Sequence, residues 1–450
     1  MGTLLIKNAS VLVTMDTYRR EIKGGGIFVR DGIIEVIGSE GDLPREADEV
    51  VNASDCIVLP GLVNTHHHFY QNLTRTVPAA QNATLFQWLR TLYPIWAQMG
   101  PPEIQCSTQL ALSEMALAGT TCTSDHLYLF PNGVRLDDEI EAAQEIGVRL
   151  HATRGAMSIG ESDGGLPPDQ LVEGEKQILD DSLRLIQAYH DPKPGAMIRI
   201  GIAPCSPFSV TRELMRDAAL LARDQGVMLH THLAENEQDV EYSIRRFGCR
   251  PGDYAEELGW VGDDVWHAHC VKLNEREIKL FAHTNTGVAH CPCSNMRLGS
   301  GIAPISQMLK HQVNVSLGVD GAASNDSSDL MGEVRQVFLM QRAIHGSHII
   351  SARDAIEMAT LGGAKVLGRE DLGALEIGKR ADFAVFPVDE ISLSGAWDKV
   401  AALVFCSPIR ARHTVVEGKF IVRDGELTAT SLPKILKRHK NLTNQLINRS

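Results

Sequence analysis

Residues 57–68 read IVLPGLVNTHHH, a short apolar run that ends in three consecutive histidines. Side chains on a β-strand alternate between its two faces, so His66 and His68 can point to one side while His67 points to the other. The pair His66-x-His68 could therefore hold a metal ion. A polar loop that is rich in histidine is the alternative interpretation, and the rest of the chain has to decide between the two.

Apolar runs that end in polar side chains recur along the middle of the chain. After the run at Ile57, seven more begin at Thr120, Val148, Ile198, Val227, Val265, Gly287 and Val313. Segments with helical periodicity lie between them, such as 103–118, 171–189 and 211–223. This alternation predicts consecutive βα units. Eight such units form an α/β fold, the (β/α)8 TIM barrel, in which catalytic residues lie at the carboxyl ends of the strands.

The two ends of the chain share a different pattern, in which short β-rich runs are joined by turns that contain glycine. Asp31-Gly32 joins two such runs near the start, and Glu417-Gly418 and Asp424-Gly425 join others near the end. An Asp-Gly pair between β-rich runs is a strong signal for a hairpin. The two termini are therefore expected to contribute strands to one small β-domain.

These patterns suggest a division of the chain into two domains. Residues 59–370 are predicted to form the barrel, and residues 1–58 and 371–450 a composite β-sandwich with a C-terminal tail. The tail, residues 432–450, is basic and weakly amphipathic. We expect it to be a surface helix or a frayed end.

Composition narrows the class of protein. The 450-residue chain is long enough to bury a large core. Its net charge of −13 argues against a nucleic-acid-binding protein, which normally carries a basic patch. No apolar stretch approaches the length of a membrane span, and the N-terminus lacks the features of a signal peptide. The nine cysteines include no C-x-x-C pair and indicate reduced thiols. We expect a cytoplasmic homo-oligomer that binds a small molecule, and neither a nucleic acid nor a membrane.

Polar groups at the ends of other predicted strands would join the paired histidines. His232 and Glu235 follow the fifth strand, His269 the sixth and Asp320 the eighth. A single histidine at a strand end is more often a satisfied core group, but several at one rim indicate a metal site. Nitrogen ligands with a carboxylate suit zinc, and a catalytic zinc keeps one position open for water.

Four motifs together carry a family resemblance: P-G-x-x-x-x-H-x-H from Pro60, H-L-x-E from His232, A-H-C from Ala268 and D-G-A-A-S-N from Asp320. They resemble the amidohydrolase superfamily, specifically its cytosine/guanine deaminase and triazine hydrolase branch. The resemblance covers essentially the whole chain. It implies hydrolytic deamination of an N-heteroaromatic base. A non-catalytic scaffold with this fold is the alternative, and it would be expected to lack some of the metal residues.

The resemblance also implies a role for each site residue. It implies one Zn²⁺ per chain, with Fe²⁺ as the alternative, held by His66, His68, His232 and Asp320. Asp320 would in addition take the proton of the attacking hydroxide, which His269 would orient. Glu235 would protonate a ring nitrogen while hydroxide attacks the adjacent carbon.

Two absences favour a single metal with these ligands. The predicted fourth strand lacks the lysine that bridges two metals in other members of the superfamily. The other zinc deaminase design needs P-C-x-x-C, and Cys291-Pro-Cys293 has a different spacing. We interpret these two cysteines as packing groups of the seventh strand.

The substrate is indicated by residues that flank the metal motifs. Gln71, three residues after His68, resembles the glutamine that holds the base edge in guanine-deaminase-like enzymes, and a carboxamide can both donate and accept. Pro204-Cys205-Ser206-Pro207 resembles the 8-oxoguanine deaminase group, and Cys205 is a candidate substrate contact. This favours conversion of 8-oxoguanine to urate and ammonia. Guanine, isocytosine, pterins and hydroxytriazines stay open as substrates. Trp88 and Trp96 would either cover a flat ring or pack in the core.

Overall fold

Eight parallel strands form the centre of the computed structural model, which describes residues 2–406 and 409–449. Neighbouring strands pair in the order of the sequence, and the backbone N–H of Thr65 donates to the carbonyl of Leu317 at 3.1 Å, which joins the first strand to the last. The predicted (β/α)8 barrel is confirmed. Its strands are β8 (Leu62–Asn64), β9 (Thr120–Leu127), β10 (Arg149–Ala156), β11 (Ile198–Pro204), β12 (Met228–Leu233), β13 (Val265–His269), β14 (Gly287–His290) and β15 (Asn314–Leu317).

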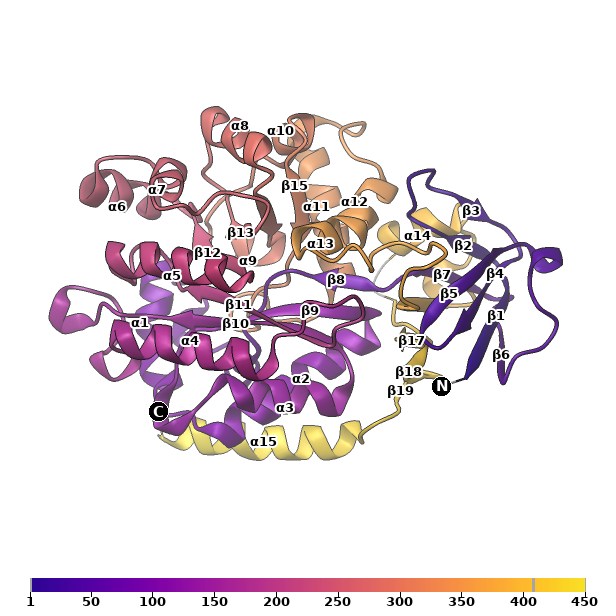
Figure 1. Ribbon diagram of the computed structural model, residues 1–450, viewed down its shortest axis with the longest axis horizontal. Helices are drawn as coiled ribbons and strands as arrows, with labels where there is room; N and C mark the ends of the chain where they lie inside the picture. Colours follow the sequence, from indigo (N-terminus) through magenta and orange to yellow (C-terminus); the bar gives the residue numbers. More distant parts are fainter. Residues whose placement is uncertain (1, 407–408, 450) are drawn as a thin grey trace.

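Helices surround the barrel (Figure 1). The predicted helices at 103–118, 171–189 and 211–223 correspond to α2, α4 and α5, with shifted ends. The helices up to the last barrel strand are α1 (Leu85–Trp96), α2 (Pro101–Leu117), α3 (Leu136–Ile146), α4 (Glu175–Tyr189), α5 (Arg212–Gln225), α6 (Glu237–Phe247), α7 (Pro251–Glu257), α8 (Glu275–Thr284), α9 (Pro292–Arg297) and α10 (Ile305–Lys310). Those that follow it are α11 (Leu330–His345), α12 (Ala352–Met358), α13 (Leu361–Val366), α14 (Lys399–Phe405) and α15 (Leu432–Arg449).

Two further sheets form a sandwich beside the barrel, on the right of Figure 1. One sheet contains β1 (Thr3–Ala9), β4 (Gly25–Arg30), β5 (Ile33–Gly38) and β6 (Glu49–Asn52). The other mixes strands from both ends of the chain: β2 (Val11–Val13), β3 (Glu21–Ile22), β7 (Cys56–Pro60), β16 (Phe383–Pro387), β17 (His413–Val416), β18 (Lys419–Arg423) and β19 (Glu426–Leu427). Both termini therefore build one sandwich, as predicted, while the boundaries at 58/59 and 370/371 stay predictions.

The predicted hairpin turns are present between β4 and β5, β17 and β18, and β18 and β19. Both residues of each turn have positive φ, from 50° at Asp31 to 78° at Gly32 and Gly425. Two positive φ values define the type I′ turn, whose twist matches that of the flanking strands. Asp-Gly and Glu-Gly fit this turn because glycine adopts positive φ at no steric cost.

The run that begins at Ile57 is divided between two sheets, which differs from the prediction of a single barrel strand. Residues up to Pro60 belong to β7 of the sandwich, and the barrel strand β8 begins only at Leu62. Gly61 lies between them, where a Cβ atom would be 2.1 Å from the Oγ1 atom of Thr121. Only glycine allows the chain to pass this close to β9 as it enters the barrel.

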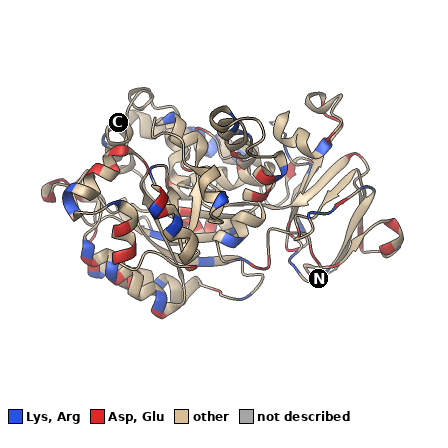
Figure 2. Ribbon diagram, turned by 90° about the horizontal axis from the view of Figure 1, so that it is seen from above, with Lys and Arg blue, Asp and Glu red and all other residues tan. Residues whose placement is uncertain are grey.

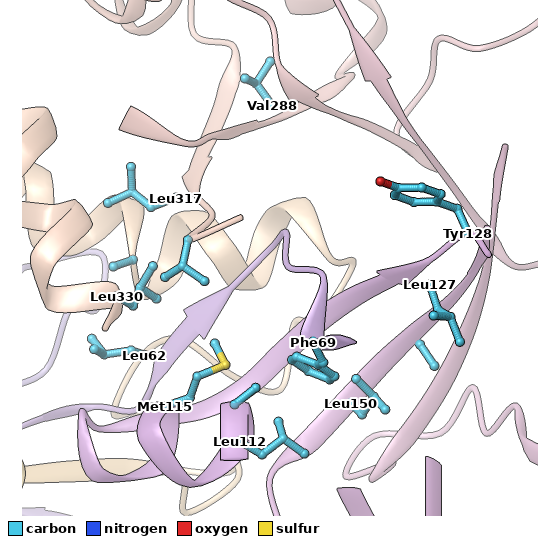
Figure 3. Close-up of a cluster of buried hydrophobic side chains, with 14 of the residues drawn as sticks. Leu62, Phe69, Leu112, Met115, Leu127, Tyr128, Leu150, Val288, Leu317 and Leu330 are labelled. Carbon is cyan, nitrogen blue, oxygen red and sulfur yellow. The ribbon is translucent and has the colours of Figure 1, made fainter. Parts of the chain in front are cut away.

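A large apolar cluster fills the space between the barrel strands and their helices. Figure 3 shows part of it, with Phe69 drawn among Leu112 of α2 and Leu150 of β10. Phe69 begins the 3₁₀ turn η2 (Phe69–Thr74), which directly follows the three histidines. The core therefore anchors the segment that carries His66 and His68.

Charged residues of both signs are interspersed along the ribbon (Figure 2). Within residues 2–406 and 409–449, no helix combines the length and apolar character that a membrane span requires.

Candidate metal centre and active-site cavity

The barrel brings the predicted metal residues together at the carboxyl end of its strands. His66 and His68 follow β8, His232 lies near the end of β12, and Asp320 lies just beyond β15. The Nε2 atoms of His68 and His232 are 3.1 Å apart, and Asp320 Oδ1 is 3.5 Å from His66 Nε2 and 3.3 Å from His68 Nε2. His66, His68 and Asp320 are buried, and His232 is half-buried. The strand ends therefore converge as the sequence predicts.

Hydrogen bonds at the far side of each ring determine which nitrogen of His68 and His232 carries the proton. His68 Nδ1 is 2.7 Å from the carbonyl of His126, and His232 Nδ1 is 2.6 Å from the carbonyl of Cys205. A carbonyl oxygen only accepts, so both Nδ1 atoms donate. The two Nε2 atoms of the neutral rings then hold lone pairs that face each other. The two lone pairs repel each other unless a cation lies between the nitrogens.

A longer chain of hydrogen bonds gives His66 the same tautomer. His230 Nδ1 donates to the carbonyl of Trp266 at 3.0 Å, which leaves His230 Nε2 to accept from His66 Nδ1 at 2.8 Å. His66 Nε2 is therefore also a lone-pair atom. It is buried and has no hydrogen-bond partner among the described residues. Burial lowers the pKa values of His66, His68 and His232, so all three rings are neutral.

Asp320 completes a set of donors that fits a divalent metal ion. Its Oδ2 atom accepts hydrogen bonds from Ser294 at 2.6 Å and Ser324 at 3.2 Å, while Oδ1 faces the histidines. Ligand atoms at zinc-bond lengths from a tetrahedral ion lie about 3.3 Å apart. The separations of 3.1 Å between His68 and His232 and 3.3–3.5 Å between Asp320 and the two β8 histidines match this value.

His67 faces away from this cluster. Its Nε2 atom is 2.9 Å from the hydroxyl of Ser328, and its Nδ1 atom accepts from the backbone N–H of His68 at 2.7 Å. Both ring nitrogens are thus occupied within the protein. Of the three consecutive histidines, the first and third face the cluster and the second supports the loop.

Glu235 and His269 form a second pair beside the metal residues. His269 Nε2 is 3.7 Å from Glu235 Oε2 and 4.0 Å from Asp320 Oδ2. Burial and the carboxylate of Asp320 raise the pKa of Glu235, although His269 opposes this shift. Burial would lower the pKa of His269, but the carboxylates of Glu235 and Asp320 outweigh it and the pKa is raised. The raised pKa of Glu235 favours the protonated carboxyl more than in a free glutamate, which suits a group that donates a proton.

Hydrogen bonds hold this pair in place. Ser300 donates to Glu235 Oε1 at 3.3 Å, and Asp239 accepts from the backbone N–H of Glu235 at 2.9 Å. His269 Nδ1 is 2.9 Å from Asn295 Oδ1. The groups that could transfer protons are therefore oriented before any ligand binds.

The metal residues open onto a cavity at the carboxyl ends of the strands. Its polar wall contains His68, His232, Glu235, His269 and Asp320. One face of α1 supplies much of the apolar wall through Leu85, Trp88, Leu89 and Tyr93. A flat, polar heterocycle fits such a cavity, with one edge toward the proton-transfer groups and its face toward apolar side chains.

Both candidate substrate contacts line the cavity. Gln71 Oε1 accepts from the backbone N–H of Ala323 at 3.4 Å, and Gly321 leaves room because a Cβ atom there would lie 1.9 Å from the same oxygen. The backbone of Ala323 therefore occupies the oxygen of the Gln71 amide, and the NH₂ group is its remaining donor. Cys205 contributes its side chain to the wall and its carbonyl to the orientation of His232.

The two tryptophans have different environments. Trp88 lines the cavity and donates from Nε1 to the carbonyl of Ala323 at 3.2 Å. Trp96 packs behind it, with ring centroids 5.4 Å apart, and donates to Thr74 Oγ1 at 3.0 Å. Trp96 therefore follows the second interpretation, that of core packing, while the covering of a ring by Trp88 stays a prediction.

The cysteines of the C-P-C segment are not part of the metal cluster. Cys291 is buried directly after β14, and Cys293 lies on α9, so neither lies within the seventh strand, where both were predicted. Burial raises the pKa of both thiols, which disfavours the thiolate form that binds metals.

Sequence reasoning assigned no role to His126 or His230, and the structure places both in the cluster. His126, on β9, has its ring 5.0 Å from that of His232 and stacked on it. Its Nδ1 atom is buried without a hydrogen-bond partner in the described part of the chain. His230 could have been found, because it lies two residues before His232 on the same face of β12.

Comparisons with known proteins identify the family. Residues 57–421 match the model of the amidohydrolase family, a span that includes the whole barrel. The chain belongs to this family. Among its amidohydrolase relatives, the 8-oxoguanine deaminase of Pseudomonas aeruginosa is 44% identical over 426 residues, 94% of this chain and 95% of the relative. The hydroxydechloroatrazine ethylaminohydrolase of a Pseudomonas species is 38% identical over 95% of this chain and 92% of the relative.

Solved amidohydrolase structures share the fold over nearly the whole chain. The atrazine chlorohydrolase of Arthrobacter aurescens TC1, complexed with zinc, superimposes with a TM-score of 0.93 at 32% identity. The match covers 98% of this chain and 100% of that chain. Zinc in that structure and the cluster of histidines and aspartate here support a divalent metal at the rim of this amidohydrolase barrel.

Proposed function

We propose that this amidohydrolase is a zinc-dependent deaminase that converts 8-oxoguanine to urate and ammonia. The observation that carries the reaction class is the set of three lone-pair nitrogens and one carboxylate beside the pair Glu235 and His269. The choice of base is supported by the 44% identity to an 8-oxoguanine deaminase over 94% of this chain. The Pro-Cys-Ser-Pro segment at Cys205, which lines the cavity, agrees with that choice.

Four residues would hold a single zinc ion: His66, His68, His232 and Asp320. When bound, zinc supplies Lewis-acid activation of a water molecule at neutral pH. Asp320 would accept the proton of that water, and Ser294 and Ser324, which donate to its Oδ2 atom, would keep the carboxylate oriented. His269 would orient the attacking oxygen through Nε2, with its other nitrogen held by Asn295.

Glu235 would supply and recover the proton that the substrate needs. It protonates a ring nitrogen as the water oxygen forms a bond to the adjacent carbon, so charge does not accumulate on the ring. A second proton transfer, to the exocyclic amino group, turns that group into ammonia as the carbon–nitrogen bond breaks. One water is consumed, and the carbon that bore the amino group becomes a carbonyl.

Gln71 and Cys205 would bind the base. The NH₂ group of Gln71 is suited to a carbonyl oxygen or a ring nitrogen of the substrate, since its own oxygen is occupied by Ala323. Burial raises the pKa of the Cys205 thiol to about 12, so it meets the substrate as a neutral S–H group. The neutral S–H group of Cys205 can donate weakly to a carbonyl oxygen of an oxidised purine, whereas a thiolate would repel that oxygen.

A screen with purified, zinc-loaded protein tests this proposal. Ammonia release is measured with 8-oxoguanine, guanine, isocytosine, isoxanthopterin and hydroxyatrazine, and urate is followed directly with the first substrate. We expect 8-oxoguanine to give the highest kcat/KM. Turnover of another heterocycle with no urate from 8-oxoguanine would overturn the substrate and keep the reaction class.

Hydroxytriazines and pterins are included because two relatives favour them. One is the 38% identical hydroxydechloroatrazine ethylaminohydrolase, and the other is an isoxanthopterin deaminase that is 36% identical over 88% of this chain. Fe²⁺ in place of zinc, a cytoplasmic location and assembly as a homo-oligomer stay predictions. Metal analysis and sedimentation of the purified protein would test the first and the last.

A further inference from the structure

The loops that carry Glu235 and His269 have a backbone conformation that is uncommon for their residues. Ala234, His269 and Cys270 have φ values of 51°, 71° and 51°. Positive φ is costly for residues other than glycine, because the Cβ atom crowds the following carbonyl. Such a conformation persists only where the surrounding structure holds it. The contacts that fix these loops therefore also fix the two proton-transfer residues.

Two backbone hydrogen bonds join the loops to each other. The N–H of Cys270 donates to the carbonyl of Leu233 at 3.1 Å, and the N–H of Lys272 donates to the carbonyl of Ala234 at 2.9 Å. The second bond holds one end of the peptide group that links Ala234 to Glu235. The position of Glu235 is thereby tied to the loop that follows β13.

Asp239 holds the other end of the same peptide group. Its Oδ2 atom accepts from the backbone N–H of Glu235 at 2.9 Å, and both residues are buried. A peptide group is planar, so bonds at its carbonyl and at its N–H together prevent it from rotating. Without Asp239, the peptide between Ala234 and Glu235 could rotate about its flanking bonds, and the Glu235 side chain would move with it.

The carboxylate of Asp239 does not serve as the cap of helix α6. Asn236 caps this helix, because its Oδ1 atom accepts from the backbone N–H of Asp239 at 3.0 Å. In the usual capping box, the side chain of the third helical residue bonds back to the backbone of the cap itself. Asp239 is this third residue, but its carboxylate reaches past the cap to the N–H of Glu235. This departure from the capping box indicates a role at Glu235.

We propose that Asp239 is a positioning residue for the proton-transfer group Glu235. It holds the peptide between Ala234 and Glu235 in place from the side opposite Lys272. Asp239 is not among the residues that line the cavity, so it acts only through Glu235. The inference rests on the proposed role of Glu235 as the acid and base of the deaminase.

Steady-state kinetics of two variants of similar shape, Asp239→Leu and Asp239→Asn, tests this role. Leucine cannot accept the N–H of Glu235, whereas the side-chain carbonyl of asparagine can. With the substrate that the screen identifies, we expect kcat of Asp239→Leu to fall about 10²-fold, the cost of a displacement of about 1 Å, while KM stays within about threefold and zinc content is unchanged. Asp239→Asn should keep kcat within about fivefold of the parent, because it retains the hydrogen bond. An unchanged kcat in Asp239→Leu, or an equal loss in both variants, would overturn the proposal.

Two alanine variants separate positioning from stability. Asp239→Ala also removes the acceptor but adds no bulk, so it should reproduce the loss of kcat even if the leucine variant folds poorly. Thr211 is the matched control, since its Oγ1 atom accepts a backbone N–H at 3.0 Å at the start of helix α5, in a different βα unit. Thr211→Ala should lower Tm, as loss of a helix cap does, and leave kcat near that of the parent. A fall in kcat as large as that of Asp239→Ala would make Asp239 a general stabilising residue and overturn the proposal.

Hydrogen exchange in the full-length, zinc-loaded protein gives a readout that needs no substrate. In Asp239→Leu the amides of Glu235 and Lys272 should exchange faster than in the parent, because rotation of the intervening peptide breaks both hydrogen bonds. Asp239→Asn and Thr211→Ala should match the parent. Equal exchange in Asp239→Leu and the parent would overturn the positioning role even if deaminase activity is found. Faster exchange in a protein without deaminase activity would keep the hold of Asp239 on this peptide and reject the proposed function.

Discussion

At the end of the barrel where the strands begin, the buried guanidinium of Arg149 binds carboxylates, whereas at the other end lone-pair nitrogens of the metal-site histidines lie together without a hydrogen-bond donor between them. Arg149, the first residue of β10, donates to both carboxylate oxygens of Asp382 at 2.7 and 2.9 Å, and it also binds Glu417. Asp382 and Glu417 come from the C-terminal part of the chain. This buried ion pair joins the barrel to the sandwich.

At the carboxyl ends of the strands the arrangement is the opposite. The ring nitrogens of His68 and His232 are 3.1 Å apart with lone pairs facing, and His66 Nε2 has no partner among the described residues. Such groups cost stability unless a ligand satisfies them. The ion pair of Arg149 holds the barrel and the sandwich together at one end. At the other end, where the histidine nitrogens lack hydrogen-bond donors, we expect the metal and the reaction.

Removing a metal ligand should have the largest effect. In His66→Ala we expect zinc and activity to be lost together, because one of three imidazoles is missing. His67→Ala should keep near-normal zinc, since His67 bonds Ser328 and His68 instead of facing the cluster. Metal analysis of both purified variants checks this. Equal loss of zinc would show that the two faces of the loop are assigned incorrectly.

Glu235→Gln should lower kcat by at least about 10²–10⁴-fold, the range typical for loss of a general acid or base. The amide keeps the size of the side chain and its contact with Ser300, but it cannot deliver a proton. Zinc content should be normal.

His269→Asn is the companion variant for this site. It should likewise retain zinc and slow the chemistry. Turnover by Glu235→Gln within tenfold of the parent, or loss of zinc from His269→Asn, would contradict the assigned roles.

Breaking the ion pair at the opposite end should affect stability and leave catalysis intact. Arg149→Met leaves Asp382 buried without its charged partner, which typically costs about 3–5 kcal/mol. The free energy of unfolding in urea should fall accordingly, with kcat within a few fold of the parent. The double variant Arg149→Met, Asp382→Leu should recover part of the loss. A large drop in kcat of the folded single variant would mean that the two ends are not separate in function.

The smallest effect is expected from the support of a ligand. His230→Phe keeps a ring stacked on Trp266, whose centroid is 4.5 Å away, and removes the acceptor that orients His66. Zinc affinity should fall by about 10–100-fold, as for other residues that orient metal ligands. Competition with a chelator measures it. His151→Phe is the matched control, because His151 lies 5.3 Å from the same tryptophan ring and does not contact His66. A similar loss of zinc affinity in His230→Phe and His151→Phe would show that His230 has no specific role in orienting His66.

The sequence was most informative where a short period decides the structure. Alternation along a strand predicted that His66 and His68 share a face, and the recurring apolar runs predicted the barrel. Type I′ hairpin turns were recognisable because Asp-Gly is nearly specific for that backbone geometry. These features are determined by residues that are close together in the sequence, so the sequence alone predicts them.

Other features depend on contacts between distant residues and could not be read this way. The tautomer of His66 is set by His230, 164 residues away, and through it by the carbonyl of Trp266. The division of the Ile57 run at Gly61 follows from a close approach to Thr121. The docking of the tail on η2 likewise requires the folded position of α15.

The sheet that mixes strands from both ends also constrains how the protein is made. Ile57 of β7 pairs with Phe386 of β16, so more than three hundred residues must be synthesised before the two can meet. At about 5–20 residues per second, the ribosome needs tens of seconds for that interval. During this time β7 emerges with an unpaired, apolar edge of the kind that associates with other chains. Nascent chains of this protein are therefore expected to depend on chaperones until their last strands leave the ribosome.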